Sequence, residues 1–174
     1  MTSTITPIDV PPSSRISREL QGAYFFDSYE IMPLAHDGRS ALDIYLMIIA
    51  KMPYWINFLM TVRNRVVAVL GLKNLGHLGD FNQAKTSCEY RVGDRVGIFS
   101  LLSISDDEII LGDSDKHLDV KVSVCKLVRQ DCPSVAVTTV VHTHNLLGRI
   151  YMLFVAPVHR RIVPASLVRA SFSV

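Results

Sequence analysis

Residues 116–124 have the sequence KHLDVKVSV, in which polar and apolar side chains alternate along the chain. Successive side chains of a β-strand point to opposite faces, so the alternation predicts a strand with one apolar and one polar face. The apolar face carries Leu118, Val120, Val122 and Val124. The polar face carries His117, Asp119, Lys121 and Ser123. We expect the apolar face to contact the core and the polar face to point to solvent or to a partner subunit.

Similar short apolar segments surround this strand and are separated by turns rich in Asp and Ser. They predict strands at residues 96–105, 108–112, 116–128 and 135–144. Consecutive strands joined by short turns favour an antiparallel meander. An aromatic segment at residues 24–31, ahead of Pro33, predicts one earlier strand. Residues 72–94 are expected to form a long loop with one short strand around residues 88–92.

Two helices are expected between the first strand and the meander. Ser40 is a suitable N-cap for a helix over residues 41–51, with Asp43 at its third position. A second helix is predicted from Pro53 to about residue 70 by apolar residues spaced three and four apart, and Gly71 is expected to end it. This pair would lie directly after the first strand.

The two ends of the chain differ in pattern. Asn145 can cap a final helix that extends to about residue 170, with breaks expected at Pro157 and Pro164. Residues 1–19 are rich in Ser, Thr and Pro and lack apolar periodicity, which predicts a flexible leader. Residues 20–174 are therefore expected to form one α+β domain with the order β-α-α, β-meander, α.

The composition limits the class of protein. The chain has 174 residues, 49% hydrophobic and 20% charged, with a net charge of +2. A chain of this length and apolar content can bury one hydrophobic core, which argues against disorder. The small net charge argues against a nucleic-acid partner. We find no signal peptide or membrane-length apolar run, which predicts a cytoplasmic protein that is not integral to a membrane. Three cysteines without a Cys-x-x-Cys pair predict neither a disulfide nor a zinc site, and we expect no cofactor.

The polar strand faces carry the weak catalytic candidates. His117 and Asp119 lie on one strand, and His142 and His144 lie on one face of the next. If these faces align, imidazoles and a carboxylate would converge, as in a metal site or an acid–base pair. The alternative, which we favour, is that these side chains point outward, because the opposite face carries the apolar residues.

The remaining candidates would contact a ligand. Arg149 and Tyr151, at the start of the last helix, could hold an anionic head group or bond to sheet carbonyls. Aromatic residues near the sheet could line a cavity or simply fill the core. The ligand-binding candidates are Arg149, Tyr151, His144, Trp55, Phe26 and Tyr29.

The order of elements resembles the helix-grip fold, in which a curved antiparallel sheet wraps around a long C-terminal helix. This is the fold of the START-like superfamily, which includes polyketide cyclases and the birch-pollen-allergen family. The resemblance lies in the topology and not in a shared motif.

Particular segments are similar to the bacterial domain of unknown function 2867 family. These segments are Arg63-Asn64-Arg65 ahead of Gly71-Leu72, residues 93–99, residues 105–112, His117-Leu118-Asp119, residues 138–142, Asn145, Gly148-Arg149 and Tyr151. They span about residues 22–165. Membership in this family implies no assigned activity.

Three functions remain open at this point. The first is the binding of a small hydrophobic or amphipathic molecule in a cavity between the sheet and the last helix. The second is a cyclase- or hydrolyase-like enzyme that uses a cavity His or Asp with Arg149. The third is an accessory domain for a separate reductase, and a homodimer is compatible with each of the three.

Overall fold

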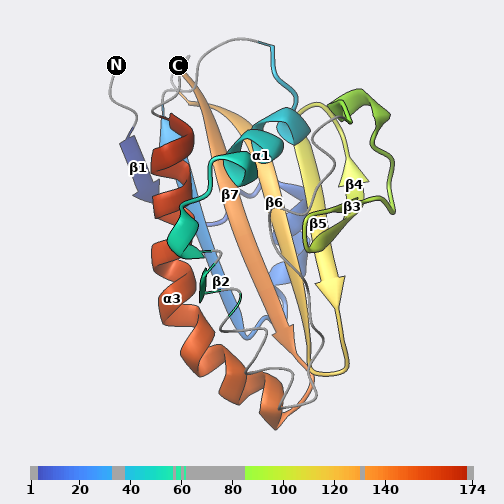
Figure 1. Ribbon diagram of the computed structural model, residues 1–174, viewed down its shortest axis with the longest axis vertical. Helices are drawn as coiled ribbons and strands as arrows, with labels where there is room; N and C mark the ends of the chain where they lie inside the picture. The colour runs from blue at the N-terminus through green and yellow to red at the C-terminus, as the bar shows by residue number, and fades with distance from the viewer. Residues whose placement is uncertain are drawn as a thin grey trace.

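The computed structural model describes residues 4–32, 38–56, 58–59, 61, 85–129 and 132–171. It is a mixed α+β structure built on a seven-stranded antiparallel sheet with a long C-terminal helix (Figure 1). The strands are β1 (Thr4–Pro7), β2 (Phe25–Met32), β3 (Arg95–Val96), β4 (Phe99–Ile104), β5 (Glu108–Ser114), β6 (Leu118–Arg129) and β7 (Cys132–Thr143). Their order across the sheet is β1-β2-β7-β6-β5-β4-β3.

The helices lie on both sides of this sheet. On one face are α1 (Ala41–Ala50) and α3 (Leu146–Ser171), and residues 54–56, 58, 59 and 61 are also helical. The 3-10 helix η1 (Arg15–Leu20) lies on the opposite face, behind the sheet in Figure 1. A second 3-10 helix, η2 (Ser87–Glu89), precedes β3. None of the described helices is both long and apolar enough to cross a bilayer.

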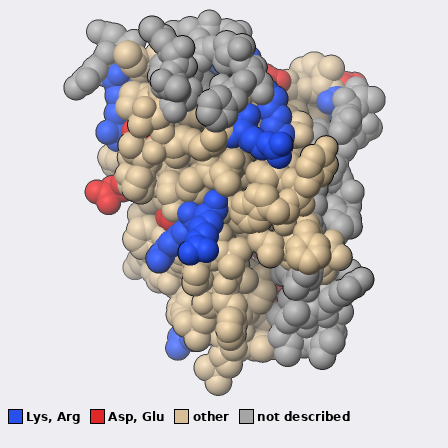
Figure 2. All heavy atoms as spheres, turned by 60° about the vertical axis from the view of Figure 1, so that its left-hand side comes forward, with Lys and Arg blue, Asp and Glu red and all other residues tan. Residues whose placement is uncertain are grey.

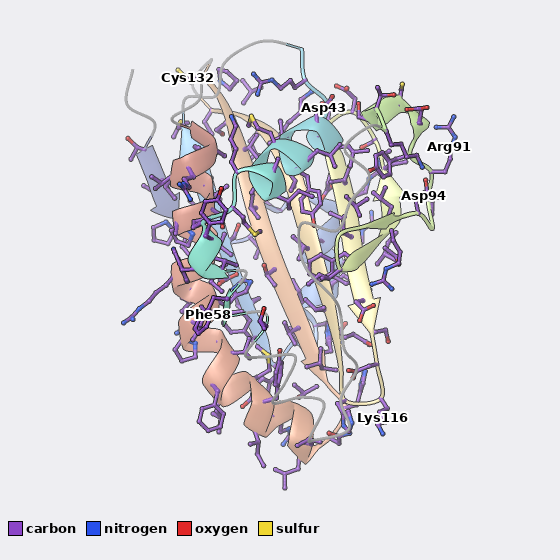
Figure 3. The ribbon with its side chains drawn as sticks, viewed as in Figure 1. Asp43, Phe58, Arg91, Asp94, Lys116 and Cys132 are labelled. Atoms are coloured by element: carbon purple, nitrogen blue, oxygen red, sulfur yellow. The ribbon has the colours of Figure 1, made fainter. Side chains whose placement is uncertain are left out.

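The predicted meander and the predicted N-cap Ser40 are confirmed. Strands β4 to β7 pair consecutively, and β6 pairs with β7 over twelve residues. Ser40 accepts a hydrogen bond from the Asp43 amide, and the Asp43 carboxylate accepts one from the Ser40 amide, which completes a capping box. Figure 3 shows Asp43 in the first turn of α1.

Three details differ from the sequence predictions. The strand expected at residues 96–105 is divided into β3 and β4 by a turn in which Gly97 has a φ of 64°. The short strand expected around residues 88–92 is wrong, because Thr86 and Glu89 cap the 3-10 helix η2 instead. Residues 62–84, which include the second half of the second predicted helix and its terminator Gly71, lie outside the described part of the chain.

The breaks expected in the last helix are also wrong. Pro157 and Pro164 both lie inside the continuous α3. Pro164 has no N–H to donate to the carbonyl of Arg160, and the hydroxyl of Tyr29 donates to that oxygen at 3.4 Å. The sheet therefore supplies the hydrogen bond that the helix lacks.

The helix-facing side of the sheet carries the main core. Side chains of alternate residues in β2, β7, β6 and β5 pack against α1 and the C-terminal part of α3. The fully buried members from the meander and the helices include Leu101, Ile109, Leu111, Val124, Leu42, Ile44 and Leu167. The apolar face predicted for residues 118–124 lies on this side, with Val122 and Val124 buried.

The opposite side of the sheet is polar and is nevertheless largely buried, which corrects the expectation that it points to solvent. Residues 8–20 cross this face, and we call them the N-terminal strap. Ile16 of the strap is fully buried, and the Glu19 carboxylate pairs with Lys121 Nζ at 2.7 Å. The segment expected to be a flexible leader thus contains β1 and η1. The division into a leader and a single domain stays a prediction.

Glu108 is the centre of the contact between the strap and the sheet. Its side chain is buried and accepts hydrogen bonds from Ser14 Oγ, from the Arg15 amide at 2.8 Å and from Ser123 Oγ at 2.7 Å. A buried carboxylate is tolerated where several donors compensate its lost hydration. The hydrogen bond to Glu108 explains why the hydroxyl of Ser123 can be fully buried on a polar face.

A first prediction follows for Glu108→Ala. The substitution leaves three donors unsatisfied under the strap, so the free energy of unfolding should fall by about 2–4 kcal/mol. Urea denaturation measures this change, and limited proteolysis should show faster cleavage within residues 8–20. Arg18→Gln, an exposed change in the same segment, is the matched control and should leave both readouts unchanged. Equal stability and equal proteolysis of the Glu108 variant would contradict the role of this carboxylate.

A second prediction concerns the thiols. Burial, followed by the neighbouring Glu108 charge, raises the pKa of Cys125 to about 11, whereas Cys88 and Cys132 are exposed. Because the thiolate is the reactive form, Ellman's reagent at neutral pH should modify Cys88 and Cys132 in the native protein and Cys125 only after unfolding. Mass spectrometry of the modified peptides identifies the sites. Rapid native modification of Cys125 would show that the strap does not protect it.

Candidate functional site

A carboxylate, an imidazole and a hydroxyl form a hydrogen-bonded chain between the sheet and α3. Asp27 of β2 and Thr139 of β7 are direct cross-strand partners on the helix-facing side. His159 of α3 reaches both of them: its Nδ1 lies 3.0 Å from Asp27 Oδ2, and its Nε2 lies 3.5 Å from Thr139 Oγ1. The imidazole therefore joins the two strands to the helix.

The partners of His159 indicate which ring nitrogen donates. An ionised carboxylate can only accept, so Nδ1 donates its proton to Asp27. Nε2 lies next to the buried hydroxyl of Thr139 and accepts from it in the tautomer that carries its proton on Nδ1. Carboxylate, imidazole and hydroxyl are arranged in the order that supports proton transfer in hydrolytic enzymes.

Apolar and aromatic groups surround this chain. The Phe25 ring meets the His159 ring edge to face, with centroids 5.7 Å apart, and the Arg160 guanidinium lies 5.5 Å from the centroid of Phe25. Burial, followed by the charge of Asp27, raises the pKa of Tyr29, against a smaller opposing effect of Arg160. Phe25 also packs with Val141 and Met152 in a second apolar cluster beside the site.

One carboxylate oxygen of Asp27 has no hydrogen-bond partner in the part of the protein that the structure describes. This atom, Oδ1, is buried, in agreement with the 10% exposure of the whole side chain. An unsatisfied buried carboxylate oxygen costs free energy unless a donor binds to it. Asp27 Oδ1 therefore keeps an unused capacity to accept a hydrogen bond, next to the apolar cluster around Phe25.

The predicted candidate His117 has a different surrounding. It lies in the turn before β6, where its Nδ1 accepts a hydrogen bond from Asn145 Nδ2 at 2.9 Å. Its Nε2 is buried and has no partner among the residues that the structure describes. Asn145 Oδ1 accepts from the Gly148 amide at 3.0 Å, which confirms Asn145 as the N-cap of α3. His117 thus anchors the start of the helix.

Asp119 and His144 are brought together, which is the convergence that the sequence left open and did not favour. His144 Nε2 donates to Asp119 Oδ1 at 3.1 Å, and Ser114 Oγ donates to the same oxygen. Burial raises the pKa of Asp119, but the hydrogen bonds from Ser114 and His144 outweigh it, so the pKa lies below its usual range. Both side chains are partly exposed at the end of the sheet.

His142 lies opposite Asp119 in the register of β6 and β7, and its Nε2 donates to the Gln21 carbonyl at 3.2 Å. It therefore attaches the segment after the strap to the sheet. Within the described part of the chain, no group of three or more His, Cys, Asp or Glu side chains is arranged to hold a metal ion. Whether His117, Asp119 or His142 acts in catalysis stays a prediction.

The ligand-binding candidates are dispersed over the molecule. Tyr29 lies near the Asp27–His159 pair, and Tyr151 packs against the adjoining apolar cluster. Arg149 and His144 are exposed at the start of α3, and Trp55 is 44% exposed among the helical residues 54–56. Phe26 is 53% exposed and points to the opposite side of the sheet from Asp27. The structure therefore does not bring these six residues to one site.

The site residues predicted from sequence do not include Asp27, Thr139 or His159, although the sequence contains two signals for them. Asp27 has the same parity as Phe25, Tyr29 and Ile31, so it is the one charged residue on an apolar strand face. His159 falls on the stripe of α3 that Met152, Val155, Val163 and Leu167 define, which is the buried side of the helix. A charged or titratable residue on an apolar stripe is the pattern that indicates such a site.

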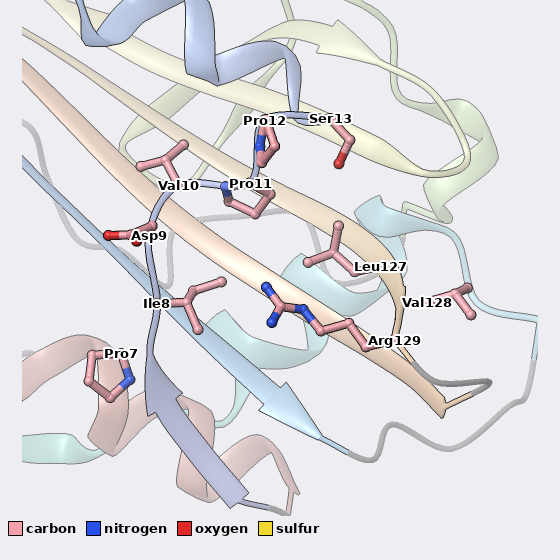
Figure 4. Close-up of a pocket in the computed structure, with 10 residues that line it drawn as sticks. All are labelled: Pro7, Ile8, Asp9, Val10, Pro11, Pro12, Ser13, Leu127, Val128 and Arg129. Atoms are coloured by element: carbon pink, nitrogen blue, oxygen red, sulfur yellow. The ribbon is translucent and has the colours of Figure 1, made fainter.

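A pocket of about 700 Å³ lies elsewhere, beneath the start of the strap and beside the end of the β6–β7 hairpin (Figure 4). Its lining consists of Pro7, Ile8, Asp9, Val10, Pro11, Pro12, Ser13, Leu127, Val128 and Arg129. Arg129 Nε lies 3.3 Å from the buried Glu30 carboxylate, which also accepts a hydrogen bond from Ser134. Cys132 and Lys116 mark the two ends of the sheet in Figure 3, and this pocket lies at the Cys132 end.

Comparison with known proteins identifies the family of this α+β chain. A family model described as protein of unknown function (DUF2867) matches residues 19–166. The chain belongs to this family. The matched segment includes β2, the meander and most of α3. No curated protein and no solved structure matches the chain.

The packing of α3 on the turn at His117 generates a third prediction. A Cβ added at Gly148 would lie 2.3 Å from the His117 carbonyl oxygen, so Gly148→Ala must displace backbone. Ala normally stabilises a helix relative to Gly by about 1 kcal/mol. Here the sign should reverse, and the free energy of unfolding should fall by about 1–3 kcal/mol.

Thermal and urea denaturation measure the effect of Gly148→Ala. The matched control is Ala156→Gly in the same helix, which should show the ordinary loss of helix propensity of about 1 kcal/mol. A Gly148 variant as stable as the natural protein would contradict the close contact between α3 and the turn.

Proposed function

We propose that this chain is a START-like helix-grip domain that binds a small amphipathic molecule between the sheet and α3. The topology supports this assignment: one strand pairs with the last strand of the meander, and the C-terminal helix lies along that pair. The additional edge strand β1 extends the sheet beside β2 without changing this order.

The observation that carries the proposal is the unpartnered Asp27 Oδ1 beside an apolar cluster. A carboxylate oxygen accepts hydrogen bonds, so the polar end of the ligand would be a donor, such as a hydroxyl or amino group. The apolar part would lie along Phe25, Val141 and Met152, since Phe25 contacts His159 directly. His159 holds the carboxylate in place through its other oxygen.

This chemistry distinguishes classes of ligand. A long-chain alcohol offers both the apolar chain and the donor, whereas the alkane of the same length lacks the donor. A fatty-acid carboxylate would meet the charge of Asp27 at close range and should bind less well. Hydrogen bonds to charged groups contribute about 1.5–3 kcal/mol, so the alcohol should bind at least about tenfold more tightly than the alkane.

The fourth prediction tests the anchor with dodecanol, dodecane and dodecanoate. Native mass spectrometry and isothermal titration calorimetry should give the order alcohol, alkane, carboxylate. Asp27→Asn should abolish the discrimination against the carboxylate, and His159→Gln should weaken alcohol binding by about tenfold.

The matched control for these variants is Ser28→Ala. Ser28 is adjacent to Asp27 in β2 but points to the other side of the sheet, where its hydroxyl bonds to Thr138. Its variant should keep the full preference for the alcohol. Equal binding of alcohol and alkane, or unchanged binding by the Asp27 variant, would refute the ligand site.

The hydrogen-bonded series Asp27–His159–Thr139 favours one alternative function, an enzyme that uses His159 for acid–base catalysis. In that function the Nε2 atom, which accepts from Thr139, would exchange a proton with the substrate. Turnover of a hydroxylated ligand that is lost in His159→Gln would support the enzyme, whereas unchanged ligand after prolonged incubation supports binding alone.

Two expectations about the whole protein remain part of this proposal. These are a cytoplasmic location and a homodimer, and both agree with a ligand-binding domain. The separate hypothesis of an accessory domain for a reductase would require a reductase that copurifies with this protein.

A further inference from the structure

The surface of α3 that faces away from the sheet carries large apolar side chains. Leu146, Leu153 and Phe154 are 71%, 65% and 74% exposed, and Ile150 and Val158 are also substantially exposed. These residues are spaced three, four and one apart, which places them on one side of a helix. We call them the outer apolar face of α3.

The residues of the outer apolar face do not lie on the buried side of the helix. Met152, Val155, His159, Val163 and Leu167 make the contacts with the sheet and with α1. The described core contacts of α3 therefore do not involve the outer apolar face. Exposed apolar residues in such a row usually mark a binding surface.

The charges around this face have a single sign. Helix α3 contains Arg149, Arg160, Arg161 and Arg169 and no Asp or Glu, and residues 132–174 contain no acidic residue at all. Arg149 lies beside the outer apolar face and Arg161 follows its end, and both are exposed. Arg160 is also exposed, although its guanidinium lies over the Phe25 ring of β2. Figure 2, which turns the side of α3 and β1 forward, shows a mostly uncharged surface with more blue than red.

We infer that the outer apolar face of α3 binds the surface of a membrane that contains anionic lipid. A helix with apolar residues on its exposed side and arginines beside them fits the membrane interface: the apolar side chains enter the acyl boundary and the guanidinium groups remain among the headgroups. Negative lipid headgroups would supply counter-charges for these arginines.

A second copy of the chain fits this face less well. In a twofold contact through α3, each helix would present its arginines to the arginines of the other, and α3 offers no acid to compensate them. A membrane accepts the convex helix without a complementary groove. The inference goes beyond the proposed ligand site, which lies on the opposite side of α3.

The fifth prediction uses vesicles of phosphatidylcholine alone and of phosphatidylcholine mixed with phosphatidylserine. The full chain should float with the mixed vesicles and much less with the neutral ones, and high salt should weaken the binding. Arg161→Gln should reduce the partition coefficient about fivefold. Phe154→Ser should reduce it about tenfold, because the ring no longer enters the bilayer.

Matched changes on other surfaces separate this face from general effects. Val128→Asn, at a residue 75% exposed near the end of β6, controls for the loss of exposed apolar area, and Arg18→Gln on η1 controls for the loss of charge. Both should keep the natural partition coefficient. Because all four sites are exposed, circular dichroism should show the same fold in every variant.

Three outcomes would overturn the inference. The first is equal partition into neutral and anionic vesicles, and the second is equal loss in the control variants. The third is a stable dimer without vesicle binding that Phe154→Ser converts to a monomer, measured by sedimentation velocity. Asp27→Asn should leave vesicle binding intact, so failure of the ligand site and failure of this surface are distinguishable.

Discussion

The antiparallel pairing of β6 with β7 is the contact on which the rest of the structure depends. It runs without interruption from Leu118 opposite Thr143 to Arg129 opposite Cys132. Because side chains alternate between faces, a shift of one residue would move every apolar side chain of these strands to the wrong side. The same register positions Thr139 beside Val122 on one strand and beside Asp27 on the other.

The sheet that results is buried on both sides by different means. Helices α1 and α3 cover one side with apolar contacts, and the strap covers the other through a buried carboxylate and its donors. Two strands that alternate cleanly would ordinarily leave their polar side in water. Here the hydroxyls of Ser14, Ser28, Ser123, Ser134 and Thr138 are hydrogen-bonded within the protein, which allows a polar surface to become an interior.

The candidate site lies where a charged side chain interrupts the apolar side of the sheet. Asp27 introduces a charge into the apolar side of β2, and one imidazole satisfies only one of its two oxygens. The outer side of α3 has the converse property, because it exposes apolar groups where solvent is expected. A ligand with a donor group would satisfy the second oxygen of Asp27. An anionic membrane surface would cover the apolar groups on the outer side of α3.

Much of the fold could be predicted from sequence, and little of the site. The alternation in residues 116–124, Ser40 with Asp43, and Asn145 are local signals, and the structure confirms the strand and both caps. The contact of Asp119 with His144 was only one of two alternatives that the faces of adjacent strands left open. Asp27 and His159 were missed because their residue numbers differ by 132, and no local rule relates them.

Sequence alone therefore determined the elements and the apolar and polar faces of the meander, because side-chain period and capping depend on residues two to four positions apart. Only the tertiary structure decided that the strap covers the polar face, that α3 continues through both prolines, and that Asp27 meets His159. Each of these requires a hydrogen-bond partner from a distant part of the chain: Glu108 for the strap, Tyr29 for the helix and His159 for the carboxylate.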